Sequence, residues 1–237
     1  MMKQFAVIGL GSFGLRVVAE MQELDAEIII LDRESDVIDQ LKDSVHAAYI
    51  VDVEDEGAIN KLIPSSIDAV ILDLGDNLEV TILVTNYLKK MGVENIVVKA
   101  SSDKHGEILT IVGASHVIYP DLEAAKRVTP LLVSDTLYNF IPISSGLVMA
   151  EIFVPKKYVG KTLIEANLRY EEGVNIVAIK KGNIGEYSFF VPDYSLEADD
   201  ILLAVGAEDN IMGFTAVGGL KSDRKLSSIL RKIFGKS

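Results

Sequence analysis

Residues 4–14, which read QFAVI-GLGSFG, decide the fold. Gln4–Ile8 is a short, apolar run that predicts a buried strand. The glycine-rich residues 9–14 follow at once and open a helical pattern over residues 13–23. A G-x-G-x-x-G turn between a strand and a helix is typical of loops that hold the pyrophosphate of a dinucleotide.

Each position of this loop has an expected role. Gly9 permits the tight turn, Gly11 lets the backbone approach a phosphate, and Gly14 lets the helix and the strand pack closely. Backbone N–H groups at Ser12 and Phe13 then lie at the positive end of the helix, facing the phosphates. We therefore expect these five residues to bind nucleotide.

The first 133 residues continue this alternation of strand and helix. The predicted strands are Gln4–Ile8, Glu27–Leu31, Ala47–Val51, Ala69–Leu72, Asn95–Lys99 and His116–Tyr119. The predicted helices are residues 13–23, 35–42, 55–62, 77–90, 103–111 and 121–133. Six such units predict an α/β fold, a Rossmann-like doubly wound parallel sheet, as a nucleotide-binding domain over residues 1–133.

The pattern changes after residue 133. Residues 134–145 are expected to be a connecting segment, with a short helix over Ser134–Phe140 that Pro142 ends. Residues 146–215 predict a small α+β domain with a hairpin turn at Gly182. Its predicted strands are Leu147–Val154, Asn175–Lys180, Ser188–Val191 and Ile201–Val205, and its helices are Leu163–Ala166 and Asp209–Phe214.

The last residues, 221–237, form a basic amphipathic pattern. Its apolar positions have helical spacing: Leu226, Ile229, Leu230, Ile233 and Phe234. The segment carries a charge of +5. Since the net charge of the whole chain is −12, the other 220 residues carry −17. The segment is either an ordinary terminal helix or one that docks on anionic lipid or a membrane partner.

Composition narrows the function further. The acidic body of this 237-residue chain argues against general nucleic-acid binding, which needs a basic surface. Cysteine is absent, which excludes a disulfide framework, a thiolate metal site and a cysteine nucleophile. Without a long apolar run or a signal-peptide pattern, the sequence predicts a cytoplasmic location.

Charged residues follow several predicted strands. Asp32 ends the second strand, where an acid accepts ribose hydroxyls and favours NAD or an adenosine nucleotide over NADP; its alternative role is a helix N-cap. Arg33 beside it either stacks on adenine or is solvated. Asp52 and Val53 follow the third strand, where Asp52 either contacts the adenine end or caps the next helix.

The fourth and fifth strands contribute further candidates. Asp73, Gly75, Asp76 and Asn77 follow the fourth strand, beside the expected phosphate cleft. Lys99 ends the fifth strand, where its side chain could reach a phosphate.

Catalytic groups are less evident. The three histidines, His46, His105 and His116, lie in different strand–helix units and have no carboxylate at ligand spacing. The sequence has no G-x-S-x-G, H-E-x-x-H or Walker A lysine motif. A nucleotide site without such groups indicates sensing rather than catalysis.

Taken together, the motifs resemble those of the RCK domains of bacterial potassium uptake systems. The resemblance rests on the 9–14 loop, Asp32, and the segments Ile50–Asp52, Val97–Ala100 and Val112–Pro120. The pattern from Val154 to Leu202, with Gly160-Lys161-Thr162-Leu163 and Asn175–Ile179, resembles the companion C-terminal RCK domain. The order of the two is similar to that of KtrA/TrkA-type regulatory subunits.

That resemblance implies a regulatory role. Such subunits form a cytoplasmic ring of dimers, usually octameric, at the inner face of the membrane beneath a potassium-translocating subunit of the KtrB/TrkH type. ATP or ADP, or NAD(H), is the implied ligand. KtrA-type chains commonly carry arginine where this chain has Ser12, and Arg16 one turn later need not replace it, which favours NAD(H).

Two further sites are implied by the same resemblance. The family's metal-binding glutamate corresponds to Asp121, a shorter acid, so Mg²⁺ or another divalent cation is an expected ligand there. The C-terminal domain of related proteins binds cyclic di-AMP at a dimer interface. The corresponding residues here are Leu163, Ile164, Asn167, Arg169 and Asn175, whose alternative role is a dimer core with a surface arginine.

We therefore predict a non-enzymatic, nucleotide-sensing subunit that gates a membrane potassium transporter. An NAD-dependent oxidoreductase is one alternative, supported by the glycine-rich loop and opposed by the small second domain. A stand-alone nucleotide or redox sensor is the other.

Overall fold

The protein is described by a computed structural model that covers residues 2–24 and 26–215. The described chain forms two compact units, and the break between them falls between Leu122 and Glu123. The predicted basic helix over residues 221–237 lies outside the described residues.

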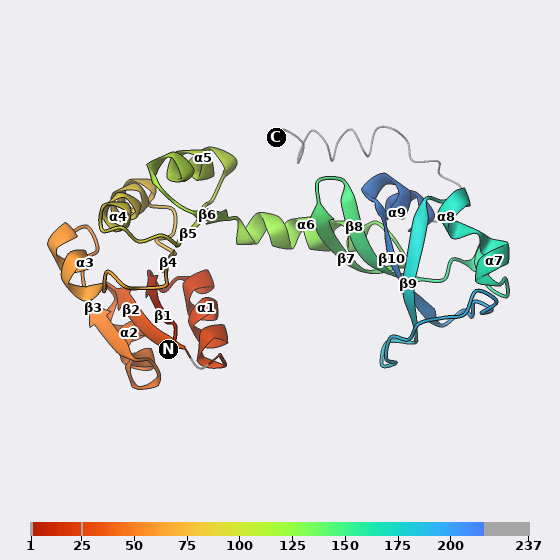
Figure 1. Ribbon diagram of the computed structural model, residues 1–237, viewed down its shortest axis with the longest axis horizontal. Helices are drawn as coiled ribbons and strands as arrows, with labels where there is room; N and C mark the ends of the chain where they lie inside the picture. Colours follow the sequence, from red (N-terminus) through yellow and green to blue (C-terminus); the bar gives the residue numbers. More distant parts are fainter. Residues whose placement is uncertain (1, 25, 216–237) are drawn as a thin grey trace. The chain divides into compact units, whose positions relative to one another are not determined.

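The first unit is a parallel sheet of six strands with helices on it, in the order β3-β2-β1-β4-β5-β6 (Figure 1). The strands are β1 (Gln4–Ile8), β2 (Glu27–Asp32), β3 (Ala47–Ile50), β4 (Ala69–Leu72), β5 (Ile96–Lys99) and β6 (His116–Ile118). The helices are α1 (Ser12–Gln22), α2 (Ser35–Leu41), α3 (Glu56–Leu62), α4 (Leu78–Lys90) and α5 (Asp103–Val112), and α6 (Pro120–Leu132) follows. The predicted doubly wound fold is confirmed.

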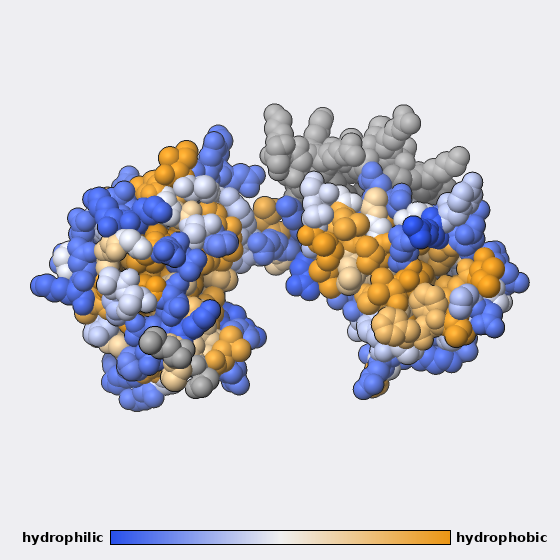
Figure 2. All heavy atoms as spheres, viewed as in Figure 1, coloured by the Kyte–Doolittle hydropathy of each residue, from blue (hydrophilic) through white to orange (hydrophobic). Residues whose placement is uncertain are grey.

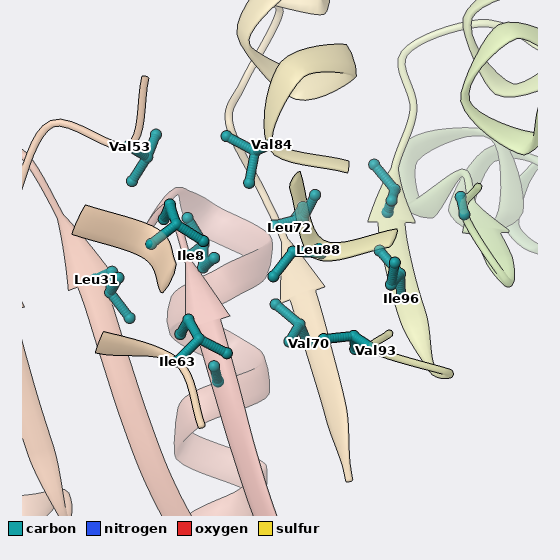
Figure 3. Packing of buried hydrophobic residues seen from close by; sticks show 14 of the residues in the cluster. Ile8, Leu31, Val53, Ile63, Val70, Leu72, Val84, Leu88, Val93 and Ile96 are labelled. Atoms are coloured by element: carbon teal, nitrogen blue, oxygen red, sulfur yellow. The ribbon is translucent and has the colours of Figure 1, made fainter. Parts of the chain in front are cut away.

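Consecutive apolar residues make these strands central. Val7 and Ile8 are fully buried, as are Ile30 and Leu31, because helices cover both faces of the sheet. Figure 3 shows one layer of this core, where strand side chains meet those of α4. The labelled strand residues are Ile8, Leu31, Val70, Leu72 and Ile96, and those of α4 are Val84 and Leu88. Burial of one such side chain contributes roughly 1.5–3 kcal/mol.

The order of the strands determines where the candidate site lies. The chain runs outward from β1 to β2 and β3, and then crosses back to β4 on the other side of β1. The carboxyl ends of β1 and β4 therefore lie side by side, and the Asp73 N–H donates to the Ile8 carbonyl at 2.9 Å. In open α/β sheets, ligands bind at this switch point.

The second unit contains an antiparallel sheet in the order β7-β8-β10-β9. Its strands are β7 (Leu137–Ser144), β8 (Leu147–Phe153), β9 (Val174–Lys181) and β10 (Asp200–Ala207). Its helices are α7 (Leu163–Ala166), α8 (Leu168–Glu171) and α9 (Glu208–Thr215). Phe214 of α9 packs with Tyr158 in the core, at 5.7 Å between ring centroids.

A partly buried ion pair ties this sheet together. Glu151 of β8 and Lys180 of β9 meet at 2.8 Å across β10, and Asn139 of β7 donates to the same carboxylate. Burial raises the pKa of Glu151, but hydrogen bonds from Lys180 and other neighbours outweigh it and lower the pKa overall. The hydrogen bond to Glu151 likewise raises the pKa of Lys180.

The predicted helix over Ser134–Phe140 is wrong, because these residues lead into the edge strand β7. Leu137 and Phe140 are both buried and three residues apart, a spacing typical of a helix. An irregularity in the register with β8, between Leu137 and Asn139, turns both side chains to one face of the sheet. Pro142 fits in β7 because an edge strand leaves backbone groups without a sheet partner.

The predicted strand over Ser188–Val191 is also wrong. The chain turns at Gly182, whose φ is +58°, as expected. Only Ser188 then returns to the sheet, through two hydrogen bonds with Ile179 at 2.9 and 3.0 Å. The fourth strand of this sheet is β7 instead.

Candidate nucleotide-binding site

The glycine-rich loop joins β1 to α1, and three of its glycines are sterically required. Gly9 has φ +85°, and a Cβ on it would lie 2.1 Å from the Asp73 carbonyl oxygen. A Cβ on Gly11 would lie 2.6 Å from Asp73 Oδ2, and one on Gly14 would lie 2.3 Å from the Gly9 carbonyl oxygen. The loop therefore has the close packing that the sequence pattern predicts.

Helix α1 begins at Ser12 without a side-chain cap of its own, because its N-cap residue is Gly11. Its first-turn N–H groups accordingly need partners from outside the helix. The Gly14 N–H finds one in Asp73 Oδ2, at 2.9 Å and in a buried setting. A carboxylate is thus bound at the end of the helix that attracts anions.

Asp32 faces the loop from the end of β2. Its Oδ2 accepts from the Leu10 N–H at 2.6 Å, and its Oδ1 accepts from the Glu34 N–H at 2.9 Å. It does not cap α2, whose N-cap is Glu34. Each carboxylate oxygen has a further lone pair, so Asp32 remains able to accept from ribose hydroxyls.

Lys99 and Asp73 form an ion pair at the end of β4 and β5. Lys99 Nζ lies 3.1 Å from Asp73 Oδ1, and the Asp73 side chain is fully buried while that of Lys99 is 19% exposed. The contact between Lys99 and Asp73 is an ion pair without a hydrogen bond, because Oδ1 accepts no hydrogen bond from any of the described residues. The sequence placed Asp73 beside the phosphate cleft but gave it no role.

The other residues predicted on the adenine side differ in accessibility. Arg33 is exposed and pairs with Glu34 at 3.2 Å. Asp52 accepts from the Glu54 N–H at 3.1 Å, whereas the N-cap of α3 is Asp55. Val53 is buried in the core, so only its backbone is available to a ligand.

The residues predicted on the phosphate side also differ in accessibility. Phe13 packs against the core. Gly75 has φ +64° and open space where a Cβ would lie. Arg16 points along its own helix to Glu20, at 2.7 Å, and both side chains are well exposed.

A small pocket lies at the ends of β4 and β5. Gly75, Lys99, Ser101 and His105 contribute to its lining. Ser101 Oγ lies 2.8 Å from His105 Nδ1, on the first turn of α5. Sequence reasoning missed His105 here, because this contact joins a loop residue to a helix residue and has no motif.

Asp121 lies in the first turn of α6 and is exposed. Among the described residues, no three His, Asp or Glu side chains are grouped closely enough to hold a metal ion. A cation bound by Asp121 would therefore need further ligands, such as phosphate oxygens.

The residues predicted for a second ligand lie on α7, α8 and β9 of the second unit. Asn167 joins the two short helices with φ +43°, a left-handed conformation that asparagine tolerates. Ile164, Arg169 and Asn175 are exposed, whereas Leu163 packs partly against the core. The helix α8, which carries Arg169, was not predicted.

Family models match both units. The TrkA-N domain matches residues 5–120, and the TrkA-C domain matches residues 148–217. Ktr system potassium uptake protein C from Bacillus subtilis (strain 168) is 33% identical, over 90% of this chain and 96% of that protein. Ktr system potassium uptake protein A from Vibrio alginolyticus is 32% identical, over 88% and 94% respectively.

Solved structures share the fold. The crystal structure of the GsuK RCK domain matches 91% of this chain with a TM-score of 0.62 at 16% identity. The GsuK channel bound to NAD matches 94% with a TM-score of 0.63 at 16% identity. This chain spans only 47% and 41% of those chains. The predicted resemblance to RCK domains is confirmed, and the chain belongs to the Ktr family of potassium uptake proteins, with a TrkA-N domain followed by a TrkA-C domain.

Proposed function

We propose that this chain is the nucleotide-sensing regulatory subunit of a membrane potassium transporter. One observation carries the proposal: a glycine-rich loop with Asp32 facing it lies in a chain that matches a Ktr protein over 96% of that protein's length. The place of action is the cytoplasmic face of the membrane. Among the described residues, no helix is long and apolar enough to cross a bilayer.

The proposed ligand is an adenine nucleotide, either ATP or ADP, or NAD(H). Asp32 supports a ligand with free ribose hydroxyls, and the GsuK channel of similar fold was solved with NAD. A divalent cation held by Asp121 together with phosphate oxygens completes this proposal.

Binding acts by shifting a population. A ligand moves a two-state assembly only as far as its affinities for the two states differ. We propose that the two states differ in nucleotide affinity because of the glycine-rich loop. The hydrogen bond from Gly14 to Asp73 joins this loop and the start of α1 to the end of β4. The nucleotide would thereby bias the partner pore without any bond being broken.

A ring of identical subunits, an octamer, is the proposed assembly beneath a potassium-translocating subunit. Figure 2 shows hydrophobic side chains gathered on one face of the second unit. Exposed apolar residues of this unit include Ile164, Val177, Phe189 and Val191. Exposed apolar patches of this kind are typical of protein–protein interfaces, which supports contact with another subunit.

The test is potassium uptake by cells that lack their own regulatory subunit and produce this chain with a Ktr-type translocating subunit. Asp32→Ala should weaken adenine-nucleotide binding by about tenfold or more, because a charged acceptor is lost. It should also reduce nucleotide-dependent uptake. Asp36→Ala, an exposed acid on α2, is the matched control and should change neither.

Uptake that does not respond to this chain would contradict the proposed function. We also propose that the chain catalyses no reaction of its own. Incubation of purified protein with NADH and small carbonyl compounds should leave the nicotinamide absorbance unchanged, and turnover would favour an oxidoreductase.

A further inference from the structure

The phosphate side of the loop contains a negative charge that belongs to the protein. Asp73 Oδ2 accepts from the Gly14 N–H at 2.9 Å, and the same oxygen lies 2.6 Å from where a Cβ on Gly11 would be. The carboxylate therefore lies against the part of α1 to which a nucleotide phosphate is drawn.

Burial strengthens the effect of this charge. The Asp73 side chain is fully buried, so solvent screens it little. Its Oδ1 has no hydrogen bond from the described residues, and a buried carboxylate oxygen without one is costly. A second anion brought to the loop would be repelled by this poorly screened carboxylate.

The positive charge of Lys99 is already used to neutralise Asp73, so it adds no net positive charge for a ligand phosphate. The Lys99 Nζ is 3.1 Å from Asp73 Oδ1. A lysine held by an internal carboxylate attracts a ligand phosphate less than a free lysine would. Ser12 and Arg16 add no free cation at the loop, because Ser12 is uncharged and Arg16 pairs with Glu20.

The cost of phosphate binding next to Asp73 rises with phosphate charge. In a dinucleotide such as NAD(H), each phosphate of the pyrophosphate bridge carries one negative charge, whereas the phosphate chain of ADP or ATP ends in a phosphate that carries a second one. Like charges close together in a poorly screened site repel strongly.

We propose that Asp73 is a specificity-determining residue that makes this site prefer a dinucleotide such as NAD(H) over ATP or ADP. The inference rests on the proposed nucleotide site and goes beyond it by naming the ligand class. The carboxylate discriminates by phosphate charge, and the Lys99 pairing keeps it in place against the loop.

The experiment is equilibrium binding of NADH, ADP and ATP to the purified full chain and to Asp73→Asn. Asparagine keeps the acceptor for the Gly14 N–H and removes the charge. The unsubstituted protein should bind NADH more tightly than ATP. In Asp73→Asn the ratio of ATP to NADH affinity should rise by about tenfold or more, which corresponds to about 1.4 kcal/mol.

A matched control is Glu79→Gln, which removes one negative charge from an exposed site in the first turn of α4. The ratio of ATP to NADH affinity in this variant should equal that of the unsubstituted protein. Lys99→Gln is the second variant, in case Asp73→Asn does not fold. It leaves the carboxylate uncompensated, so the ratio should fall instead.

The outcomes separate the two proposals. Tighter binding of ATP than NADH by the unsubstituted protein, or an unchanged ratio in both variants, overturns the role of Asp73 and leaves the nucleotide site intact. No binding of any of the three ligands, by the unsubstituted protein or by Asp73→Asn, overturns the nucleotide site itself.

Discussion

The backbone of Gly14 serves both the packing of the fold and the geometry of the candidate nucleotide site. Its N–H holds Asp73, and its missing side chain lets α1 approach the Gly9 carbonyl oxygen. A side chain at this position would therefore disturb both the packing of β1 with α1 and the loop.

Gly14→Ala tests this dual role. The added Cβ would lie 2.3 Å from the Gly9 carbonyl oxygen, a backbone atom that cannot move freely. We expect a loss of about 1–3 kcal/mol in the free energy of unfolding, measured by urea denaturation, and loss of nucleotide binding. Gly213→Ala in α9, where a Cβ meets nothing within 4 Å, is the control and should be neutral or stabilising. A fully stable Gly14→Ala protein would contradict the steric argument.

Residue types predicted part of this site. Glycine and aspartate at motif spacing placed Gly9, Gly11, Gly14 and Asp32 together, because the strand–turn–helix geometry follows from local sequence. The role of Asp73 was not predictable in this way. Its contact with Gly14 spans 59 positions in sequence and depends on β4 lying next to β1.

At the scale of elements, short runs of apolar residues predicted the buried parallel strands well. Periodicity failed for β7, where the spacing of Leu137 and Phe140 is equally typical of a helix. Only pairing with β8, a tertiary contact, decides between the two structures. The predicted strand over residues 188–191 fails for the same reason, because only Ser188 of these residues has a sheet partner.

The Glu151–Lys180 pair gives the second unit a testable pH dependence. The lowered pKa of Glu151 stabilises the fold above the ordinary value of 4.5, and this contribution is lost as pH falls through the folded-state pKa. The raised pKa of Lys180 stabilises the fold below 10.5, and this contribution is lost as pH rises through its folded-state pKa.

Glu151→Gln should therefore lower the free energy of unfolding by about 2 kcal/mol near neutral pH, because it removes a hydrogen bond between charged groups and leaves Lys180 without its charge partner. The difference from the unsubstituted protein should shrink below pH 4.5 and above pH 10.5, in urea titrations across pH. Lys181→Gln, which breaks an exposed pair with Glu197, is the comparison and should have little effect. A Glu151→Gln deficit that is constant with pH would refute the linkage.

At the scale of the whole molecule, charge is divided unevenly along the chain. Residues 221–237 carry +5 and the remaining residues carry −17. An acidic body is repelled by an anionic membrane, so we expect any electrostatic attraction to such a membrane to come from this basic segment.

A chain that ends at residue 220 should therefore lose binding to vesicles that contain anionic lipid. Sedimentation with such vesicles measures this, and neutral vesicles and raised salt serve as controls because both remove the attraction. The mass in solution should stay the same if assembly uses the two units alone. Equal sedimentation of the shortened and full chains would assign membrane contact to another surface.

The two carboxylates at the glycine-rich loop also have a consequence for amide hydrogen exchange. The Leu10 N–H is held by Asp32 and the Gly14 N–H by Asp73. Both amides should exchange slowly with deuterium even without a ligand, as bonded backbone groups do. Added nucleotide should then slow Leu10 very little. In Asp32→Ala, Leu10 alone should exchange faster, so that the loop reports on each carboxylate separately.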